Sequence, residues 1–262
     1  MKVYYRTKKI TEPIRIPYNY NISNALSGAL ELGLECIAYS SVNEIIDSYE
    51  RGDIVLDGID QVQYCLSKFN IKPQEFNYPE VLKPYLGRKI WKDTINHISS
   101  DERLWSKGYF VKPIKEKAFA GKVISSIKDL IGCGSCYEDY EVFVSEPVDI
   151  LYECRGFVYY DELKDLRPYK GDYRYMKYMD TDLIEQAMND WTKWENRPNS
   201  CSLDWSVIRK SDINGNISYK TILIEGNLPY ALGCYGYPSY DYIKLISAYI
   251  SQISNIPDEL HF

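Results

Sequence analysis

The sequence predicts an α+β protein in which a small α/β unit precedes a larger strand-rich region. Strand-like and helix-like segments alternate over the first 70 residues, which is typical of a parallel sheet with covering helices. From about residue 107 short alternating strands prevail, and an amphipathic helix, a hairpin signal and a last helix close the chain. At 262 residues the chain is long enough for one large domain or two smaller ones.

The first third of the chain contains the alternating elements. Apolar spacing predicts an extended edge strand first, followed by helices and strands in turn. In order they are the strand 1–7, the helix 23–35, the strand 36–39, the helix 42–49, the strand 53–58 and a helix through Cys65 and Leu66. Prolines in the connector 72–83 mark the end of this unit. We therefore expect an N-terminal α/β domain over residues 1–85.

Residues 86–262 form the second predicted domain. Its expected strands are 108–114, 122–124, 140–148 and 151–160, and its expected helices are 125–130, 180–194 and 240–253. In the helix 180–194, apolar residues including Trp191 and Trp194 recur on one face. This stripe is interpreted as part of the core.

Asn214-Gly215 lies between two alternating apolar segments, 202–210 and 217–225. Asn-Gly in this setting is typical of a β-hairpin with a two-residue type I′ turn. If these two residues form the loop, Ile213 pairs with Asn216. Continued along the strands, that register makes one face apolar and sets Asp204 directly opposite Glu225.

Directly opposed carboxylates repel and destabilise a strand pair, so a compensating cation is expected where Asp204 meets Glu225. Carboxylate oxygens are natural ligands of Mg²⁺, and Asn227 projects to the same face and adds an amide oxygen. Gly226 lets a ligand or backbone approach closely. The pattern predicts a magnesium site. The alternative is a solvated sheet end, where a bulge or a one-residue slip separates the two acids.

Lys112 lies near the end of the apolar strand 108–114. A lysine at a buried strand position needs an anionic partner, and a phosphate group is the expected ligand. The following loop carries Lys115 and Lys117 and could close over phosphates with Lys117 and backbone N–H groups. It lacks the residues of a Walker loop. A solvated basic loop is the alternative for these two lysines.

Together these features resemble the ATP-grasp family. A strand ending in Phe-Val-Lys-Pro precedes a glycine-bearing loop, a helix and the alternating strand EVFVSEP. The most specific part is the closing hairpin, in which LDWSV supplies an acid and ILIEGNLPYALG supplies Glu-x-Asn. The segment YPEVLKPYLGRKIW and the Glu-x-Arg of YECRGFV further resemble a sparsely characterised ATP-grasp clade of bacteria and phages. The resemblance covers about residues 75–250.

The resemblance implies an ATP-grasp fold, in which two α+β subdomains grip ATP after a pre-ATP-grasp domain. The lysine strand, loop and hinge would occupy about residues 107–150, and the metal-binding core subdomain would occupy residues 151–262. Lys112 would then bind the α and β phosphates and contribute to catalysis, and Lys117 would be a second phosphate contact.

The same resemblance assigns the remaining ATP and metal contacts. The hinge against the adenine would consist of Glu146, Pro147 and Val148, which offer backbone groups. Glu153 would reach the ribose or the phosphates. The magnesium ligands would be Asp204, Glu225 and Asn227.

One position departs from the family pattern. Well-known ligases of this family have an arginine two residues before the metal-binding acid, where this chain has Ser202. Another cation must therefore stabilise the developing charge, and the candidates are Arg155, Arg174 and Arg88. We expect Arg155 to act, because it shares a strand face with Glu153 and could neutralise a phosphoryl or acyl-phosphate oxygen.

The implied activity is an ATP- and Mg²⁺-dependent ligase that activates a carboxylate as an acyl phosphate and joins it to an amine. Its substrates would be small-molecule or peptide carboxylates and amines, with an amino acid, a peptide or a protein as acceptor. Two alternatives stay open: an ATP-grasp phosphotransferase, and a nucleotide-binding interaction module without catalysis.

Composition excludes other classes of function. The net charge of −6 and the short basic clusters argue against nucleic-acid or membrane-surface binding. No apolar segment is long enough to span a bilayer, and the N-terminus lacks a signal peptide's apolar core. Seven scattered cysteines indicate reduced thiols and a cytoplasmic protein, in the host cytoplasm if phage-encoded. Cys133 and Cys136 form one C-x-x-C without a second pair, which disfavours a zinc site.

Overall fold

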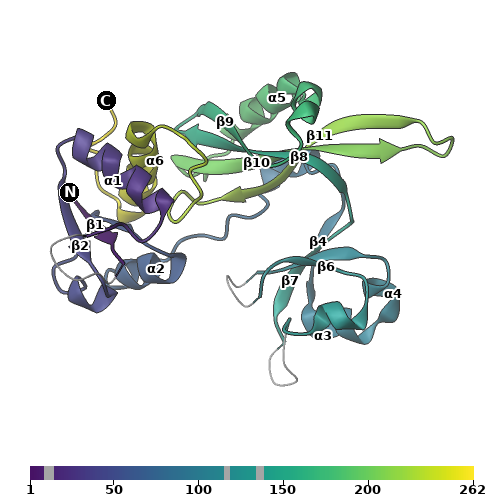
Figure 1. Cartoon of the computed structure of the whole chain (residues 1–262), viewed down its shortest axis with the longest axis horizontal. Helices are drawn as coiled ribbons and strands as arrows, with labels where there is room; N and C mark the ends of the chain where they lie inside the picture. The colour runs from purple at the N-terminus through teal and green to yellow at the C-terminus, as the bar shows by residue number, and fades with distance from the viewer. Residues whose placement is uncertain (9–14, 115–118, 134–138) are drawn as a thin grey trace. The chain divides into compact units, whose positions relative to one another are not determined.

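The computed structural model describes residues 1–8, 15–114, 119–133 and 139–262 (Figure 1). These residues form two compact units. The first unit comprises Met1–Tyr85, Tyr152–Val207 and Thr221–Phe262, and the second comprises Leu86–Leu151 and Ile208–Lys220. The division into domains at residues 1–85 and 86–262 stays a prediction.

The N-terminal part of the first unit is the expected α/β arrangement. Its elements are β1 (Lys2–Arg6), α1 (Tyr20–Glu31), β2 (Glu35–Tyr39), the 3₁₀ turn η1 (Val42–Glu44), β3 (Ile54–Leu56), α2 (Ile59–Ser67) and the 3₁₀ segment η2 (Glu80–Tyr85). The three strands form a parallel sheet in the order β2-β1-β3. The prediction of an edge strand over residues 1–7 is therefore wrong, because β1 pairs on both sides. Its Val3 and Tyr4 are fully buried, as a central strand requires.

The helix expected over residues 42–49 is also wrong beyond its first turn. The carboxylate of Glu44 accepts the Ser41 N–H and closes a short capped turn. Beyond it, the Lys68 ammonium donates to the carbonyl oxygens of Ile46, Asp47 and Tyr49 at 2.8–2.9 Å. Lys68 thus satisfies carbonyl groups at the end of this segment, as a basic side chain does at a helix C-terminus.

The second unit contains an antiparallel sheet of order β4-β7-β5-β6. Its elements are β4 (Ile90–Thr94), α3 (Ile95–Ser100), α4 (Glu102–Trp105), β5 (Tyr109–Pro113), β6 (Lys122–Ile124), the 3₁₀ turn η3 (Ile127–Leu130) and β7 (Glu141–Ser145). The sequence did not predict β4, α3 or α4. The helix expected over residues 125–130 is the short turn η3, capped by Ser126 and Asp129.

The largest sheet runs in the order β11-β10-β8-β9. The remaining elements are β8 (Asp149–Tyr159), β9 (Glu162–Gly171), the 3₁₀ segment η4 (Tyr173–Tyr178), α5 (Thr181–Thr192), β10 (Ser200–Ser211), β11 (Ile217–Asn227) and α6 (Ser239–Ser254). The sequence missed β9, whose side chains are only partly buried or exposed. An apolar alternation is therefore weak in this strand.

The Asn-Gly hairpin forms, but with a three-residue loop. The Gly215 N–H donates to the Asp212 carbonyl at 3.1 Å, and the Asp212 N–H donates to the Asn216 carbonyl at 3.0 Å. Gly215 has a φ of +80°, as in a type I turn followed by a left-handed residue. The Asp212 carboxylate accepts the N–H groups of Asn214 and Asn216 at 2.8 Å each, which favours this longer loop. The predicted pairing of Ile213 with Asn216 is wrong by one residue.

The aromatic stripe of α5 packs in the interior, as predicted. Trp191 is fully buried, and Phe76 contacts it edge-on and stacks on Trp194. A Cβ added at Gly226 would lie 2.8 Å from the Phe76 ring. The close approach expected at Gly226 is therefore made by an aromatic ring.

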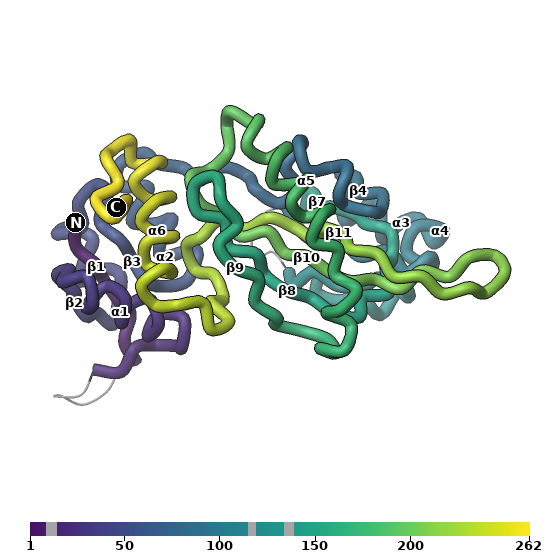
Figure 2. The backbone as a smooth tube through the Cα atoms, turned by 90° about the horizontal axis from the view of Figure 1, so that it is seen from above, coloured from purple at the N-terminus to yellow at the C-terminus, as the bar shows by residue number. Residues whose placement is uncertain are grey.

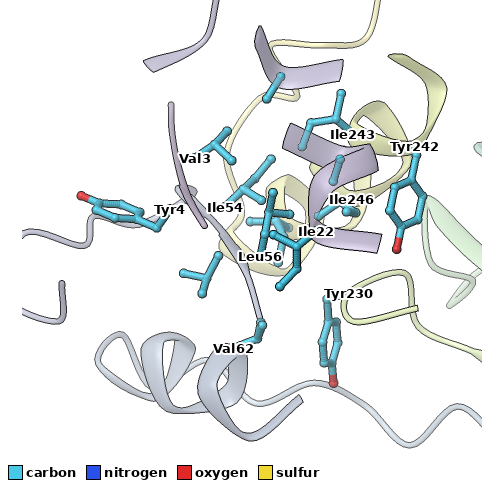
Figure 3. Close-up of a cluster of buried hydrophobic side chains, with 14 of the residues drawn as sticks. Val3, Tyr4, Ile22, Ile54, Leu56, Val62, Tyr230, Tyr242, Ile243 and Ile246 are labelled. Atoms are coloured by element: carbon cyan, nitrogen blue, oxygen red, sulfur yellow. The ribbon is translucent and has the colours of Figure 1, made fainter. Parts of the chain in front are cut away.

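The main core of the first unit joins the N-terminal elements to the last helix (Figure 3). Side chains from β1, β3, α1 and α6 meet in one cluster that includes Val3, Ile22, Ile54 and Ile246. The helices α1 and α6 lie side by side (Figure 2). Gly28 permits this contact, because a Cβ there would overlap the Ser239 carbonyl oxygen.

We predict that Gly28→Ala lowers the free energy of unfolding by about 1–3 kcal/mol, because the added methyl overpacks the α1–α6 contact. In an unconstrained helix the same change would stabilise by roughly 0.5–1 kcal/mol. Urea denaturation measures the difference. Ser27→Ala, on the exposed side of the same helix, is the control and should be neutral. A stabilised Gly28→Ala protein would contradict this packing.

Burial raises the pKa of the Cys65 thiol to about 11 and that of Cys154 to about 12. Since the thiolate is the reactive form, we predict that both resist a thiol reagent at pH 8 in the native protein. Both should react promptly in denaturant. Mass spectrometry of labelled peptides measures this, and fast native labelling of Cys154 would contradict its burial.

Within the described residues no helix is long and apolar enough to cross a membrane.

Candidate active site

Five of the predicted site residues lie on the four-stranded sheet, within the first unit. Glu153 and Arg155 are on β8, Asp204 is on β10, and Glu225 and Asn227 are on β11. Since β10 lies between β8 and β11, Asp204 occupies the central strand of this group.

Arg155 and Asp204 form a buried bidentate ion pair. The Arg155 Nε and one terminal nitrogen donate to the two carboxylate oxygens of Asp204, each at 2.8 Å. The residues are 7% and 1% exposed, so water screens the pair little. The compensating cation expected from the sequence is therefore present in the chain itself, as an arginine on the neighbouring strand.

The charges around Asp204 act in opposite directions on its pKa. Burial, followed by the charges of Glu225 and Glu153, raises the pKa of Asp204, and Arg155 opposes that rise. Burial alone would lower the pKa of Arg155, but its bonds to Asp204 raise it, so the guanidinium stays charged. The raised pKa of Asp204 means that this pocket holds negative charge less well than water does. Because burial is the largest cause, the shift reflects lost hydration of the carboxylate, which the ion pair with Arg155 partly offsets.

Glu225 and Asn227 complete the acidic face. The Asn227 amide nitrogen lies 3.3 Å from Glu225 Oε1 and 3.5 Å from Asp204 Oδ2. If the register at the turn continued unbroken, Asp204 would lie opposite Ile224, on the other face from Glu225. The contact through Asn227 requires the pairing to shift by one residue between the turn and the site. The predicted proximity is thus found, whereas the pairing predicted at the turn is wrong by one residue.

Glu153 is held by two residues that the sequence did not identify. Tyr169 Oη donates to Glu153 Oε2 at 2.8 Å, and Lys170 Nζ lies 2.8 Å from Oε1. In the β8–β9 register the partner changes from Lys170 to Pro168, which skips Tyr169. Tyr169 is therefore the extra residue of a β-bulge, a feature that redirects side chains near active sites.

A second unpredicted contributor is the loop after β11. The Gly233 carbonyl accepts a hydrogen bond from Arg155 at 3.2 Å. The Tyr235 ring stacks on Tyr169 with centroids 4.9 Å apart, and the guanidinium carbon of Arg155 lies 5.1 Å from the Tyr235 centroid. Tyr235 has a φ of +45°, which is strained for a non-glycine residue. No local sequence signal marks Tyr235, because its role depends on contacts with other strands.

The other predicted ATP contacts belong to the second unit. Lys112 lies on β5, and its Cβ and the Phe110 ring both face Gly121, so Lys112 and Phe110 share one side of the strand, as predicted. Lys117 lies outside the described residues. Glu146 follows β7, and Pro147 is exposed and Val148 partly buried.

The backbone of Glu146 is already hydrogen-bonded. Its N–H donates to the Lys89 carbonyl at 3.1 Å, and its carbonyl accepts from Ser145 Oγ at 3.0 Å. Its side chain accepts the Lys89 N–H at 2.9 Å. Since Pro147 has no N–H, Glu146 and Val148 are the two residues of the predicted hinge that carry a backbone N–H.

The three arginines considered for the reaction centre lie in different surroundings. Arg155 contacts Asp204, whereas Arg174 is exposed and pairs with Asp172. Arg88 Nε donates to Ser145 Oγ at 2.8 Å, in the second unit. Ser202, at the position of the family's usual arginine, is fully buried.

The residues fit a hard cation. Asp204, Glu225 and Asn227 offer carboxylate and amide oxygens, which suit Mg²⁺. Among the described residues, no three His, Cys, Asp or Glu side chains are grouped so as to hold a metal ion. The predicted set contains only two such side chains, so the magnesium site stays a prediction.

Of the C-x-x-C pair, Cys133 is buried, and Cys136 lies outside the described residues.

The fold and the site together define an ATP-grasp protein. A family model for the ATP-grasp domain, R2K clade family 2, matches residues 85–245. The chain belongs to this family, and its fold is the α+β ATP-grasp fold with a preceding α/β domain. A comparison with curated proteins found no match.

Solved structures of ATP-grasp ligases are distantly similar. N5-carboxyaminoimidazole synthetase from Staphylococcus aureus is 13% identical, with a TM-score of 0.48 over 94% of this chain and 77% of that one. D-alanine–D-alanine ligase from Bacillus anthracis is 10% identical, with a TM-score of 0.46 over 97% and 99%. The macrocyclase MdnC from Microcystis aeruginosa MRC, bound with precursor peptide MdnA, is 13% identical, with a TM-score of 0.43 over 97% and 100%. The family assignment rests on the match over residues 85–245.

We predict that Arg155→Met lowers the free energy of unfolding by about 3–5 kcal/mol, because it leaves the Asp204 carboxylate buried without a counter-ion. Arg155→Met combined with Asp204→Leu should recover most of this loss, since neither charge of the pair remains. Urea denaturation of the metal-free proteins measures both values. If the double variant were less stable than Arg155→Met, the pair would not behave as a coupled buried ion pair.

Proposed function

We propose that the protein is an ATP- and Mg²⁺-dependent ligase that activates a carboxylate as an acyl phosphate and joins it to an amine. The observation that carries this proposal is the buried acidic face of the large sheet, where Arg155, Asp204 and Asn227 meet in a member of the ATP-grasp family. The acid substrate would be a small-molecule or peptide carboxylate, and the amine would come from an amino acid, a peptide or a protein.

Asp204, Glu225 and Asn227 would hold Mg²⁺. The ion would supply charge neutralisation on the phosphates during transfer. The position of the Asn227 amide between the two acids supports this set.

Lys112 and the hinge would bind the nucleotide. Lys112 lies at the end of an apolar strand and would bind the α and β phosphates, with Lys117 as a second contact. Val148 would meet the adenine edge through its backbone, beside Glu146 and Pro147. Glu153, oriented by Tyr169 and Lys170, would reach the ribose or the phosphates.

Arg155 would stabilise the charge that develops during both steps. In the first step a carboxylate oxygen attacks the γ-phosphorus and ADP leaves. In the second the amine attacks the acyl carbon, phosphate leaves and the amine loses a proton. Arg155 donates three of its N–H groups to Asp204 and Gly233, and its remaining N–H donors can bind phosphoryl or acyl-phosphate oxygens.

The proposal is tested by ADP release from ATP and Mg²⁺ in a pool of amino acids and small carboxylates. We predict that Glu225→Ala lowers the rate about 100-fold or more, because a ligand to the cation is lost. Glu162→Ala removes an exposed acid from β9 in the same sheet and should leave the rate unchanged. Equal turnover by the wild type and Glu225→Ala would contradict the metal assignment.

Product analysis separates the ligase from its alternatives. A ligase releases inorganic phosphate only when both the acid and the amine are present. A phosphotransferase leaves the γ-phosphate on its acceptor, and an interaction module binds ATP without turnover. Either of these results would overturn the proposed reaction.

A further inference from the structure

Arg155 occupies both oxygens of Asp204, the carboxylate that the proposed function assigns to a divalent cation. The two hydrogen bonds of 2.8 Å use both carboxylate oxygens in a fork geometry. Asp204 is 1% exposed, so little water is present to screen two cations that share it. A divalent ion and the guanidinium therefore compete for the same buried charge.

Arg155 also has contacts that do not involve Asp204. The Gly233 carbonyl accepts from its other terminal nitrogen at 3.2 Å. The Tyr235 and Tyr169 ring centroids lie 5.1 and 5.8 Å from its guanidinium carbon, within the range of a cation–π contact. A guanidinium released from Asp204 would keep these partners.

The loop is shaped to present these contacts. A Cβ at Gly233 would lie 2.7 Å from the Tyr235 ring, so a glycine is needed for the ring to lie over the backbone. Tyr235 adopts a left-handed backbone conformation, and its stacking on Tyr169 holds it there. Strained residues of this kind persist where the surrounding contacts determine them.

We propose that Arg155 is the counter-ion of Asp204 only until the divalent cation binds, and that Tyr235 and the Gly233 carbonyl then retain the released guanidinium. In that state the N–H groups that had served Asp204 can donate to an anionic ligand, the transferred phosphoryl group or the acyl phosphate. Metal binding would thus free Arg155 for the reaction. The inference rests on the proposed function, because it requires the cation at Asp204.

Binding of Mn²⁺ alone, measured by electron paramagnetic resonance, tests the competition. Arg155→Gln removes the competing charge and should bind Mn²⁺ about 10-fold more tightly than the wild type, within the usual range of coupling between sites. Arg167→Gln is the matched control, because Arg167 pairs with Arg155 across β8 and β9 but bonds to Asp165 instead. Its Mn²⁺ affinity should equal that of the wild type. Asp204→Asn should lose binding.

These variants separate the two possible failures. If Asp204→Asn loses Mn²⁺ binding but Arg155→Gln binds no more tightly than the wild type, the competition is refuted and the proposed function stands. If Asp204→Asn binds like the wild type, the assigned metal site is wrong, and the competition falls with it.

A measurement on the wild type covers the case in which Arg155→Gln fails to fold. In ¹⁵N-arginine-labelled protein, the Nε–H of Arg155 should give an exchange-protected resonance, assigned through its shift in Asp204→Asn. Saturating Mg²⁺ should move this resonance in the wild type and leave it unchanged in Asp204→Asn. A wild-type resonance that stays unchanged would overturn the proposal.

The retaining role of Tyr235 has its own readout. In the Mg²⁺-saturated protein, Tyr235→Phe keeps the ring and should leave the Arg155 Nε–H resonance where the wild type has it. Tyr235→Leu removes the ring and should move that resonance. The same resonance position in the two variants would show that Tyr235 does not hold the released guanidinium.

Discussion

The buried pair of Arg155 and Asp204 is the interaction around which the acidic face is organised. A lone carboxylate in this position would be strongly destabilising, because burial removes its hydration. Arg155 supplies both a charge and a matching pair of donors. Glu153 lies beside this pair on β8, and Asn227 contacts Asp204 from β11.

The N-terminal α/β elements contribute to this site through the loop that follows β11. The Cys234 N–H donates to Asn21 Oδ1 at 3.0 Å, and Asn24 Nδ2 donates to the Tyr237 carbonyl at 3.0 Å. Both asparagines belong to α1. The same loop offers the Gly233 carbonyl to Arg155. Helix α1, which is far from β8 in the sequence, therefore helps to hold the backbone that orients the arginine.

Local patterns predicted much of the architecture. The parallel α/β unit, the amphipathic helix α5, the strand that carries Lys112 and the closing hairpin all follow from periodicity and turn chemistry. These signals fail where the alternation is weak, as in β9, which has a mostly polar or partly exposed surface. The helix expected over residues 42–49 forms only the short turn η1.

The residue types of the site were readable from the sequence, because a strand's two-residue period places Glu225 and Asn227 on one side and the family pattern adds Asp204. The partners of these residues were not readable. Tyr169 reaches Glu153 through a bulge, and Tyr235 reaches Arg155 from a strained loop conformation. The sequence predicted a cation beside the acids, but it did not show that the Arg155 guanidinium pairs with Asp204. Each of these contacts joins residues on different strands or loops, and their distances depend on packing that no local pattern encodes.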